Sequence, residues 1–252
     1  MTDSWWLKVK RAQKHMVDIN REARNYAGRH PYELIRIRLP KSKREVWHRV
    51  HITEQPHPMM AVMVGDFVYN LRSALDHIIV ASVPRANRKN ASFPIVFKDL
   101  WETDADGNYV VDDADVRDNF DRAIRGLPSE ARAIVEGEQP YHGEGRAYLN
   151  TLGVISRLEN ADKHRRLTVI GGGLQNLVIS LTLRGMAVPE RFPQHRGNKF
   201  AADDTKIGVP LPARWPDGSV PKQSEVEMQT SATTKVFIKV TGVRGNEPLI
   251  NI

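Results

Sequence analysis

The chain has 252 residues, enough for one large domain or two small ones. It contains no cysteine, which excludes disulfides, cysteine-based zinc sites and a cysteine nucleophile. Its 37 basic and 30 acidic residues give a net charge of +7, a mild bias towards acidic partners such as nucleic acid. No apolar run approaches the ~20 residues that span a bilayer, and the N-terminus does not resemble a secretory signal. We therefore expect a cytoplasmic protein that does not contact a membrane.

The first part of the chain predicts long helices separated by a hairpin. Apolar residues recur at helical spacing with Lys and Arg between them until Gly28 and Pro31, and a second, longer apolar segment ends at Pro84. Between them, two runs alternate apolar and polar residues, which is typical of paired strands. The predicted elements are a helix over 4–28, a hairpin over 32–53 and a helix over 58–83.

The rest of the chain changes from helical to extended patterns. Short strands or extended pieces are predicted at 93–97 and 109–111, followed by helices over 113–125, 129–136 and 146–164. Beyond these, 167–183 predicts two strands around a glycine-rich turn, 184–224 a long loop or lobe edge, and 225–242 a final strand pair.

These elements predict an α+β fold. Its helical core consists of the helices near 4–28, 58–83, 113–136 and 146–164, and its antiparallel sheet of the N-terminal hairpin and the C-terminal strands. Residues 1–166 then form a mainly helical core with a hairpin, and 167–252 a β-rich portion. We expect both parts to pack around one core as a single domain.

A polar stripe runs along the predicted helix 58–83. Between residues 58 and 84 there is no Lys and no Glu, and the only charged residues are Asp66, Arg72 and Asp76. A solvated helix face normally carries Lys and Glu, which are strong helix formers. The composition therefore favours a partly enclosed polar site over a solvated face. On a helical wheel the stripe contains Asp66, Tyr69, Asn70, Arg72, Ser73, Asp76 and His77.

A second polar cluster, NADKHRR (160–166), stands at the end of the predicted helix 146–164. The helix dipole explains basic residues at a C-terminus, but it does not explain Asp162 on the core-facing side. If the two helices pack together, the clusters can form one pocket. That pocket would contain Arg72, Asp76, His77, Asp162, Lys163 and His164, with Arg165 and Arg166 beside it.

Such a pocket is suited to acid–base chemistry on a phosphate. An imidazole beside a carboxylate can transfer protons near neutral pH, and Arg and Lys can stabilise a phosphate. Two His and two Asp can also bind a divalent metal, but the neighbouring Arg and Lys would repel the ion. We therefore expect no metal and no cofactor.

The spacing Arg72-x4-His77, late on an apolar helix, resembles the Arg-x4–6-His motif of HEPN-domain proteins. That resemblance implies a metal-independent ribonuclease, usually all-helical and dimeric. It assigns phosphate binding to Arg72 and proton transfer at the ribose 2′-OH and the leaving oxygen to His77. The chain departs from the family in having the motif early and in having flanking β segments. The pair NLRSALDH and NADKHR is also similar to pairs in bacterial and phage proteins, which imply no activity.

Three functions follow from these patterns. The first is an RNA-directed nuclease or nucleotide-acting protein with Arg72, Asp76, His77 and His164 as catalytic residues, acting as a monomer or homodimer. Its substrate-binding residues would be Tyr69, Asn70, Asp162, Lys163, Arg165 and Arg166. The second is a non-catalytic binding or assembly protein whose polar motifs form a structural hydrogen-bond network, and the third is a pocket for a small anion. In addition, WWLKVKRAQKH (5–15) can touch nucleic acid or a membrane surface, although docking of its tryptophans on the core or on a partner is the simpler interpretation.

Overall fold

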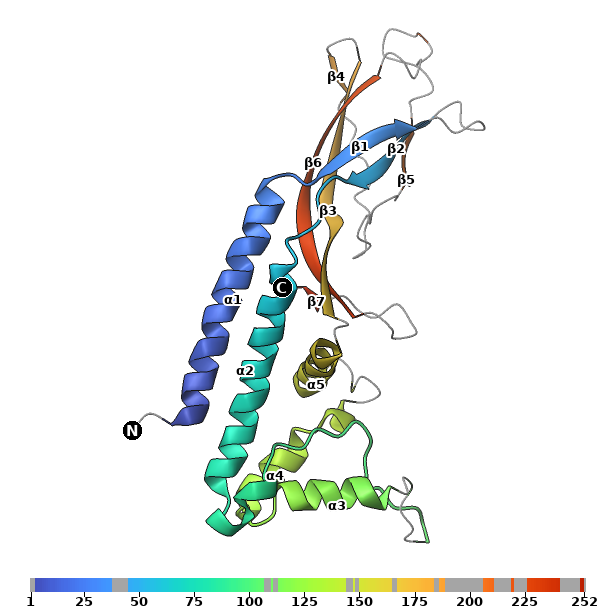
Figure 1. Cartoon of the computed structure of the whole chain (residues 1–252). Coiled ribbons are helices and arrows are strands. Elements are labelled where there is room, and N and C mark those ends of the chain that lie inside the picture. The colour runs from blue at the N-terminus through green and yellow to red at the C-terminus, as the bar shows by residue number, and fades with distance from the viewer. Residues whose placement is uncertain are drawn as a thin grey trace. The chain divides into compact units, whose positions relative to one another are not determined.

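A computed structural model of the chain describes most of its residues (Figure 1). The described residues are 3–37, 45–106, 110, 113–143, 147, 150–164, 167–183, 186–188, 206–210, 219, 226–240 and 250–251. The chain divides into two compact units. Unit 1 contains Met1–Ile19, Ala61–Leu167 and Val240–Arg244, and unit 2 contains Asn20–Met60, Thr168–Lys239 and Gly245–Ile252.

Unit 1 is helical. Helices α1 (Ser4–Gly28) and α2 (Met59–Ser82) lie side by side in opposite directions in Figure 1, in agreement with the ranges predicted from their apolar periodicity. The other helices are η1 (Arg85–Asn90), α3 (Ala114–Ala123), α4 (Ser129–Gly137), η2 (Pro140–His142) and α5 (Thr151–Lys163). Asp113 caps α3 through its side chain, which accepts a hydrogen bond from the amide of Val116.

Helix α5 begins at Thr151, five residues later than the predicted start at 146. The reason is local. The side chain of Asn150 accepts a hydrogen bond from the amide of Leu152 at 2.8 Å, so Asn150 is the N-cap. The predicted helix began too early because apolar residues before Asn150 continue the helical spacing. Residues 144–146 and 148–149 lie outside the described part of the chain.

The core of unit 1 joins the second half of α2 to the segment 91–100 and to α3 and α4. The ring of Trp101 packs edge-on against Phe120, with centroids 4.7 Å apart. The buried members of this cluster are Ile79, Val83, Phe93, Val96, Leu100, Phe120, Ile124 and Val135. Their burial fixes the C-terminal half of α2, where the Arg/His motif lies.

The segment 93–97, predicted as a short strand or an extended piece, pairs with no strand in the described part of the chain. Of the two predicted alternatives, the structure excludes the paired strand. The side chains of Asp76 in α2 and of Gln139, two residues after α4, bind its backbone groups instead of a neighbouring strand. The other predicted short strand, 109–111, lies outside the described residues except for Val110.

Unit 2 contains the strands. The hairpin of β1 (Tyr32–Ile37) and β2 (Glu45–Ile52) is confirmed, with Tyr32 opposite Ile52 and Ile37 opposite Trp47. Strand β5 (Lys206–Pro210) pairs antiparallel with β2 and completes a three-stranded sheet in the order β1-β2-β5. A second sheet has the order β4-β3-β6-β7. The hairpin thus pairs with β5, whereas the long C-terminal strands form a sheet of their own.

Three expectations for the C-terminal third need correction. Residues 167–183 form one strand, β3 (Leu167–Leu183), because glycines can remain extended when neighbouring strands bind their backbone. Likewise β6 (Val226–Val240) is one strand and not a pair. The predicted loop 184–224 contains β4 (Met186–Val188) and β5, which are too short to show a period in the sequence. The last strand is β7 (Ile250–Asn251).

Helices and antiparallel strands together confirm the α+β class. None of the described helices is long and apolar enough to cross a bilayer.

Candidate functional site

The polar stripe on α2 faces helix α1 at two points. The Nδ1 atom of His77 lies 3.1 Å from the hydroxyl of Ser4, which is the first residue of α1. The ammonium group of Lys8 lies 5.3 Å from the centroid of the Tyr69 ring, within the range of a cation–π contact. Ser4 and Lys8 are one helical turn apart, so one face of α1 reaches both groups. The sequence patterns gave no indication of either partner.

Arg72 and Asp76 form an ion pair one helical turn apart, with 3.2 Å between Nη2 and Oδ1. Only 18% of the Arg72 side chain and 33% of the Asp76 side chain are exposed, which supports a partly enclosed stripe. The same Oδ1 of Asp76 accepts a hydrogen bond from the backbone amide of Phe93 at 2.9 Å. Asp76 therefore links α2 to the extended segment that follows it.

Asn70 is buried and uses its amide within its own helix. Its Nδ2 atom donates a hydrogen bond to the carbonyl oxygen of Asp66 at 2.7 Å, one turn earlier. This bond satisfies a polar group that is only 8% exposed. Tyr69, by contrast, is 55% exposed, and the side chain of Asp66 faces solvent. The stripe is thus enclosed at Asn70 and Arg72 and open at Asp66 and Tyr69.

The second cluster meets α2 at Gly65. The carboxylate of Asp162 occupies the space that a side chain at Gly65 would fill, because a Cβ atom there would lie only 2.6 Å from Oδ1. Lys163 forms an ion pair with Glu159, one turn earlier on α5, with 2.7 Å between Nζ and Oε1. His164 is exposed at the C-cap of α5. Arg165 and Arg166 lie outside the described residues.

Asp162 meets α2 far from His77, the last residue of the stripe. Gly65, which Asp162 touches, and His77 are 12 residues apart, which corresponds to about 18 Å along the helix axis. A hydrogen-bonding group reaches its partner within about 3 Å. Asp162 and His77 therefore cannot act on the same phosphate. The structure brings Arg72 together with Asp76 and His77 together with Ser4, and it places Asp162 beside Gly65, away from His77.

Gln139, which the sequence patterns did not single out, is the most deeply enclosed polar residue of this region, with no exposed surface. Its Oε1 accepts a hydrogen bond from the amide of Val96 at 2.8 Å. Its Nε2 donates to the carbonyl oxygens of Val135 at 2.7 Å and of Pro94 at 3.1 Å. Asp76 and Gln139 thus hold the segment 93–96 from two sides, as partner strands would. In the sequence, Gln139 is marked only by its position, as an uncharged polar residue between the end of a helix and Pro140.

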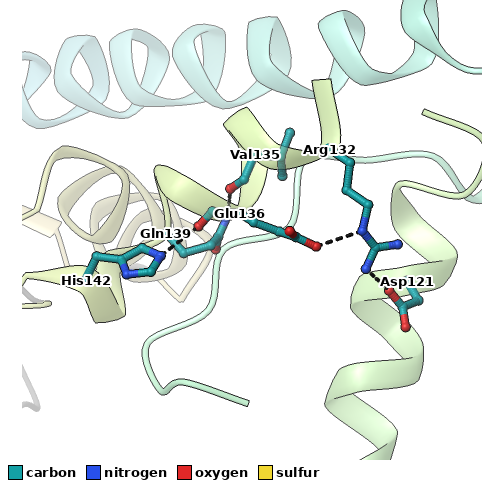
Figure 2. Close-up of polar contacts among 6 residues, drawn as sticks. All are labelled: Asp121, Arg132, Val135, Glu136, Gln139 and His142. Atoms are coloured by element: carbon teal, nitrogen blue, oxygen red, sulfur yellow. Dashed lines mark hydrogen bonds and ion pairs between the residues drawn. The ribbon is translucent and has the colours of Figure 1, made fainter. Parts of the chain in front are cut away.

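Figure 2 shows that the neighbouring charged groups pair with one another. Arg132 of α4 binds Asp121 of α3 at 2.6 Å and Glu136 at 2.7 Å. Burial lowers the pKa of Arg132, but the hydrogen bonds to these two carboxylates together raise it by more. The net shift of the pKa is therefore upward. The Nε2 atom of His142 lies 3.1 Å from the carbonyl oxygen of Glu136. These contacts join α3 to α4 and offer no unpaired charge to a ligand.

Within the described part of the chain, no three His, Asp or Glu side chains gather closely enough to hold a metal ion. The chain matches no protein-family model, no curated protein and no solved structure.

Proposed function

We propose that this chain is a non-catalytic binding or assembly protein, and that the polar residues of its Arg/His motif form a structural hydrogen-bond network. The observation that carries this proposal is the double engagement of Asp76. Its Oδ1 accepts from the amide of Phe93 at 2.9 Å and lies 3.2 Å from the guanidinium of Arg72. A carboxylate with two such partners has a structural task whether or not a substrate is present.

The position of Arg72 also supports a structural role. An arginine that binds a scissile phosphate must present its guanidinium to that phosphate. The guanidinium of Arg72 is instead paired within its own helix and is mostly enclosed. Removing one partner of an enclosed pair leaves the other charge uncompensated, which is usually destabilising. The motif therefore holds α2 against the segment that contains Phe93.

The test compares stability with RNA cleavage. We expect Arg72→Ala and Asp76→Ala to lower the melting temperature clearly, and Asp66→Ala, an exposed carboxylate on the same helix, to leave it nearly unchanged. We also expect no cleavage of total RNA by the wild type in EDTA. Cleavage that disappears in His77→Ala while the melting temperature stays constant would contradict the proposal.

A second candidate function is a metal-independent RNA-directed nuclease or nucleotide-acting protein. The observation that favours it is the contact between Nδ1 of His77 and the Ser4 hydroxyl at 3.1 Å, which orients the imidazole and leaves Nε2 for a substrate. In this case His77 transfers protons and Arg72 exchanges Asp76 for the phosphate. Single-turnover assays with a labelled oligonucleotide test this function, with Ser4→Ala as the positioning variant. A bell-shaped pH–rate profile that moves in Ser4→Ala supports it, whereas a flat zero rate rejects it.

A further inference from the structure

The outer face of α1 combines positive charge with exposed apolar side chains. The chain has no Asp or Glu between residues 4 and 17. Lys10, Arg11 and Lys14 are exposed there. Lys10 and Lys14 lie on the side of the helix opposite the buried Ala12, and Arg11 lies at the edge of that side. Three apolar residues on the same side are also exposed: Trp6 by 39%, Leu7 by 55% and Val17 by 64%. We call these six residues the α1 outer face.

This face is separate from the Arg/His motif. Ser4 and Lys8, which contact His77 and Tyr69, lie on the inner side of α1 towards α2. The outer face begins beside them and extends about 17 Å along the axis, from Trp6 to Val17. Within it, the ammonium group of Lys10 lies 5.7 Å from the Trp6 ring centroid, so a cation and an aromatic ring stand side by side at the surface.

We propose that the α1 outer face binds single-stranded nucleic acid. Three exposed cations within five residues of one helix complement a chain of phosphates, although Asp18 stands one helical turn after Lys14. An exposed tryptophan supplies a surface on which an unpaired base can stack, whatever its sequence. This inference deepens the proposed function by naming the partner of a binding protein, and rests on it to that extent, but it uses none of the network residues.

The arrangement of the face favours nucleic acid over a lipid surface. A helix that lies in a membrane interface separates an apolar side from a basic side. Here the helical wheel places Lys10 and Lys14 between Trp6 and Val17 on one flank and Leu7 and Arg11 on the other. The apolar residues therefore form no continuous side of their own. An exposed ring beside several cations is the combination that binds a single-stranded polynucleotide.

The experiment measures fluorescence anisotropy of a labelled oligouridine and of a matched RNA duplex with the full chain. We expect the single strand to bind more tightly than the duplex. For K10Q/R11Q/K14Q we expect the slope of log affinity against log salt to become shallower by about 2, since each single-strand phosphate contact contributes about 0.7. Between about 50 mM and about 200 mM salt, the wild type should then lose about 20-fold more affinity than this variant. The single variants K10Q and K14Q should each produce about a third of the change in slope expected for the triple variant.

The matched control is R85Q/R88Q/K89Q, which removes three exposed cations from η1 in the same unit. It should leave the slope unchanged. Trp6→Leu should weaken binding of the single strand without changing the slope, because it removes stacking and no charge. Trp6→Phe should restore part of the affinity.

Three results would overturn the proposal: no binding of the single strand by the wild type, an equal loss in the η1 control, or sedimentation with phosphatidylserine vesicles without oligonucleotide binding. Melting curves of Arg72→Ala test the network independently, so failure of this inference and failure of the proposed function are distinguishable.

Discussion

The backbone amide of Phe93 donates a hydrogen bond to the carboxylate of Asp76 over 2.9 Å, and this bond joins the Arg/His motif to an extended segment 17 residues further along the chain. Phe93 itself is buried in the core of unit 1. The polar stripe on α2 is therefore connected to the apolar core, because Asp76 of the stripe orients the backbone of a residue whose side chain lies in the core. Two stability predictions follow from this connection, one at each support of the segment.

The first concerns Asp76. Asp76→Asn keeps the size of the side chain but removes the charge that pairs with Arg72 and weakens the bond from Phe93. We expect a loss of about 2 kcal/mol in the free energy of unfolding, as for a partly enclosed hydrogen bond to a charged group. Urea denaturation measures it. Asp66→Asn, at an exposed position of α2, is the control and should change stability by less than about 0.5 kcal/mol. Equal effects at both positions would remove the structural role of Asp76.

The second concerns Gln139. Gln139→Ala deprives three backbone groups of their partner in a site without exposed surface. Each unsatisfied group costs about 1–3 kcal/mol, and partial relaxation towards water reduces the sum, so we expect a loss of about 3 kcal/mol. Gln13→Ala, on the exposed side of α1, is the matched control. Hydrogen exchange at the amide of Val96 should accelerate in Gln139→Ala. Unchanged exchange would show that other groups hold this segment.

The helices could be predicted from the sequence, whereas the supports of the segment 93–96 could not. Helices α1 and α2 each have a continuous apolar side that repeats within a few residues, so their ends follow from local spacing. The bonds of Gln139 to Pro94 and Val96 join residues 45 and 43 positions apart, and only tertiary packing creates them. The pairing of β5 with β2 could not be predicted for the same reason, because more than 150 residues separate the two strands in the sequence.

The candidate site shows the same limit. The absence of Lys and Glu between residues 58 and 84 indicated an enclosed stripe, and Asn70 and Arg72 are indeed largely enclosed. Composition alone could not specify the partners, which are a backbone amide for Asp76 and a hydroxyl from α1 for His77. It also could not show that Asp162 approaches α2 at Gly65, three helical turns from His77.

The third prediction tests this approach at Gly65. An alanine in a helix interior is normally more stable than glycine by about 1 kcal/mol. Here the new Cβ would lie 2.6–2.7 Å from the Asp162 carboxylate, which must then move away. We expect Gly65→Ala to destabilise the wild type but to stabilise Asp162→Ala by about 1 kcal/mol. Unfolding curves of the four proteins give the coupling energy, and additive effects would show that the two residues do not meet.

The fourth prediction concerns His48 of β2, in unit 2, which is 6% exposed and lies opposite Arg36 of β1. Burial lowers the pKa of His48 from its ordinary 6.5, and the charge of Arg36 lowers it further. The folded state then binds fewer protons than the unfolded state once the pH falls below about 6.5, so the free energy of unfolding decreases as the pH falls from there to the folded pKa. One proton limits this slope to about 1.4 kcal/mol per pH unit.

Urea denaturation of the wild type and of His48→Gln between about pH 7 and about pH 5 measures the slope due to this histidine. We expect a shallower dependence in His48→Gln, because its side chain does not titrate. Arg36→Gln should give an intermediate result, since it removes the smaller cause of the shift and leaves the burial. His48 is well suited to such a test, because it is buried and its Nδ1 atom has no hydrogen-bond partner among the described residues. A slope that is identical in the wild type and in His48→Gln would assign the acid sensitivity to other groups.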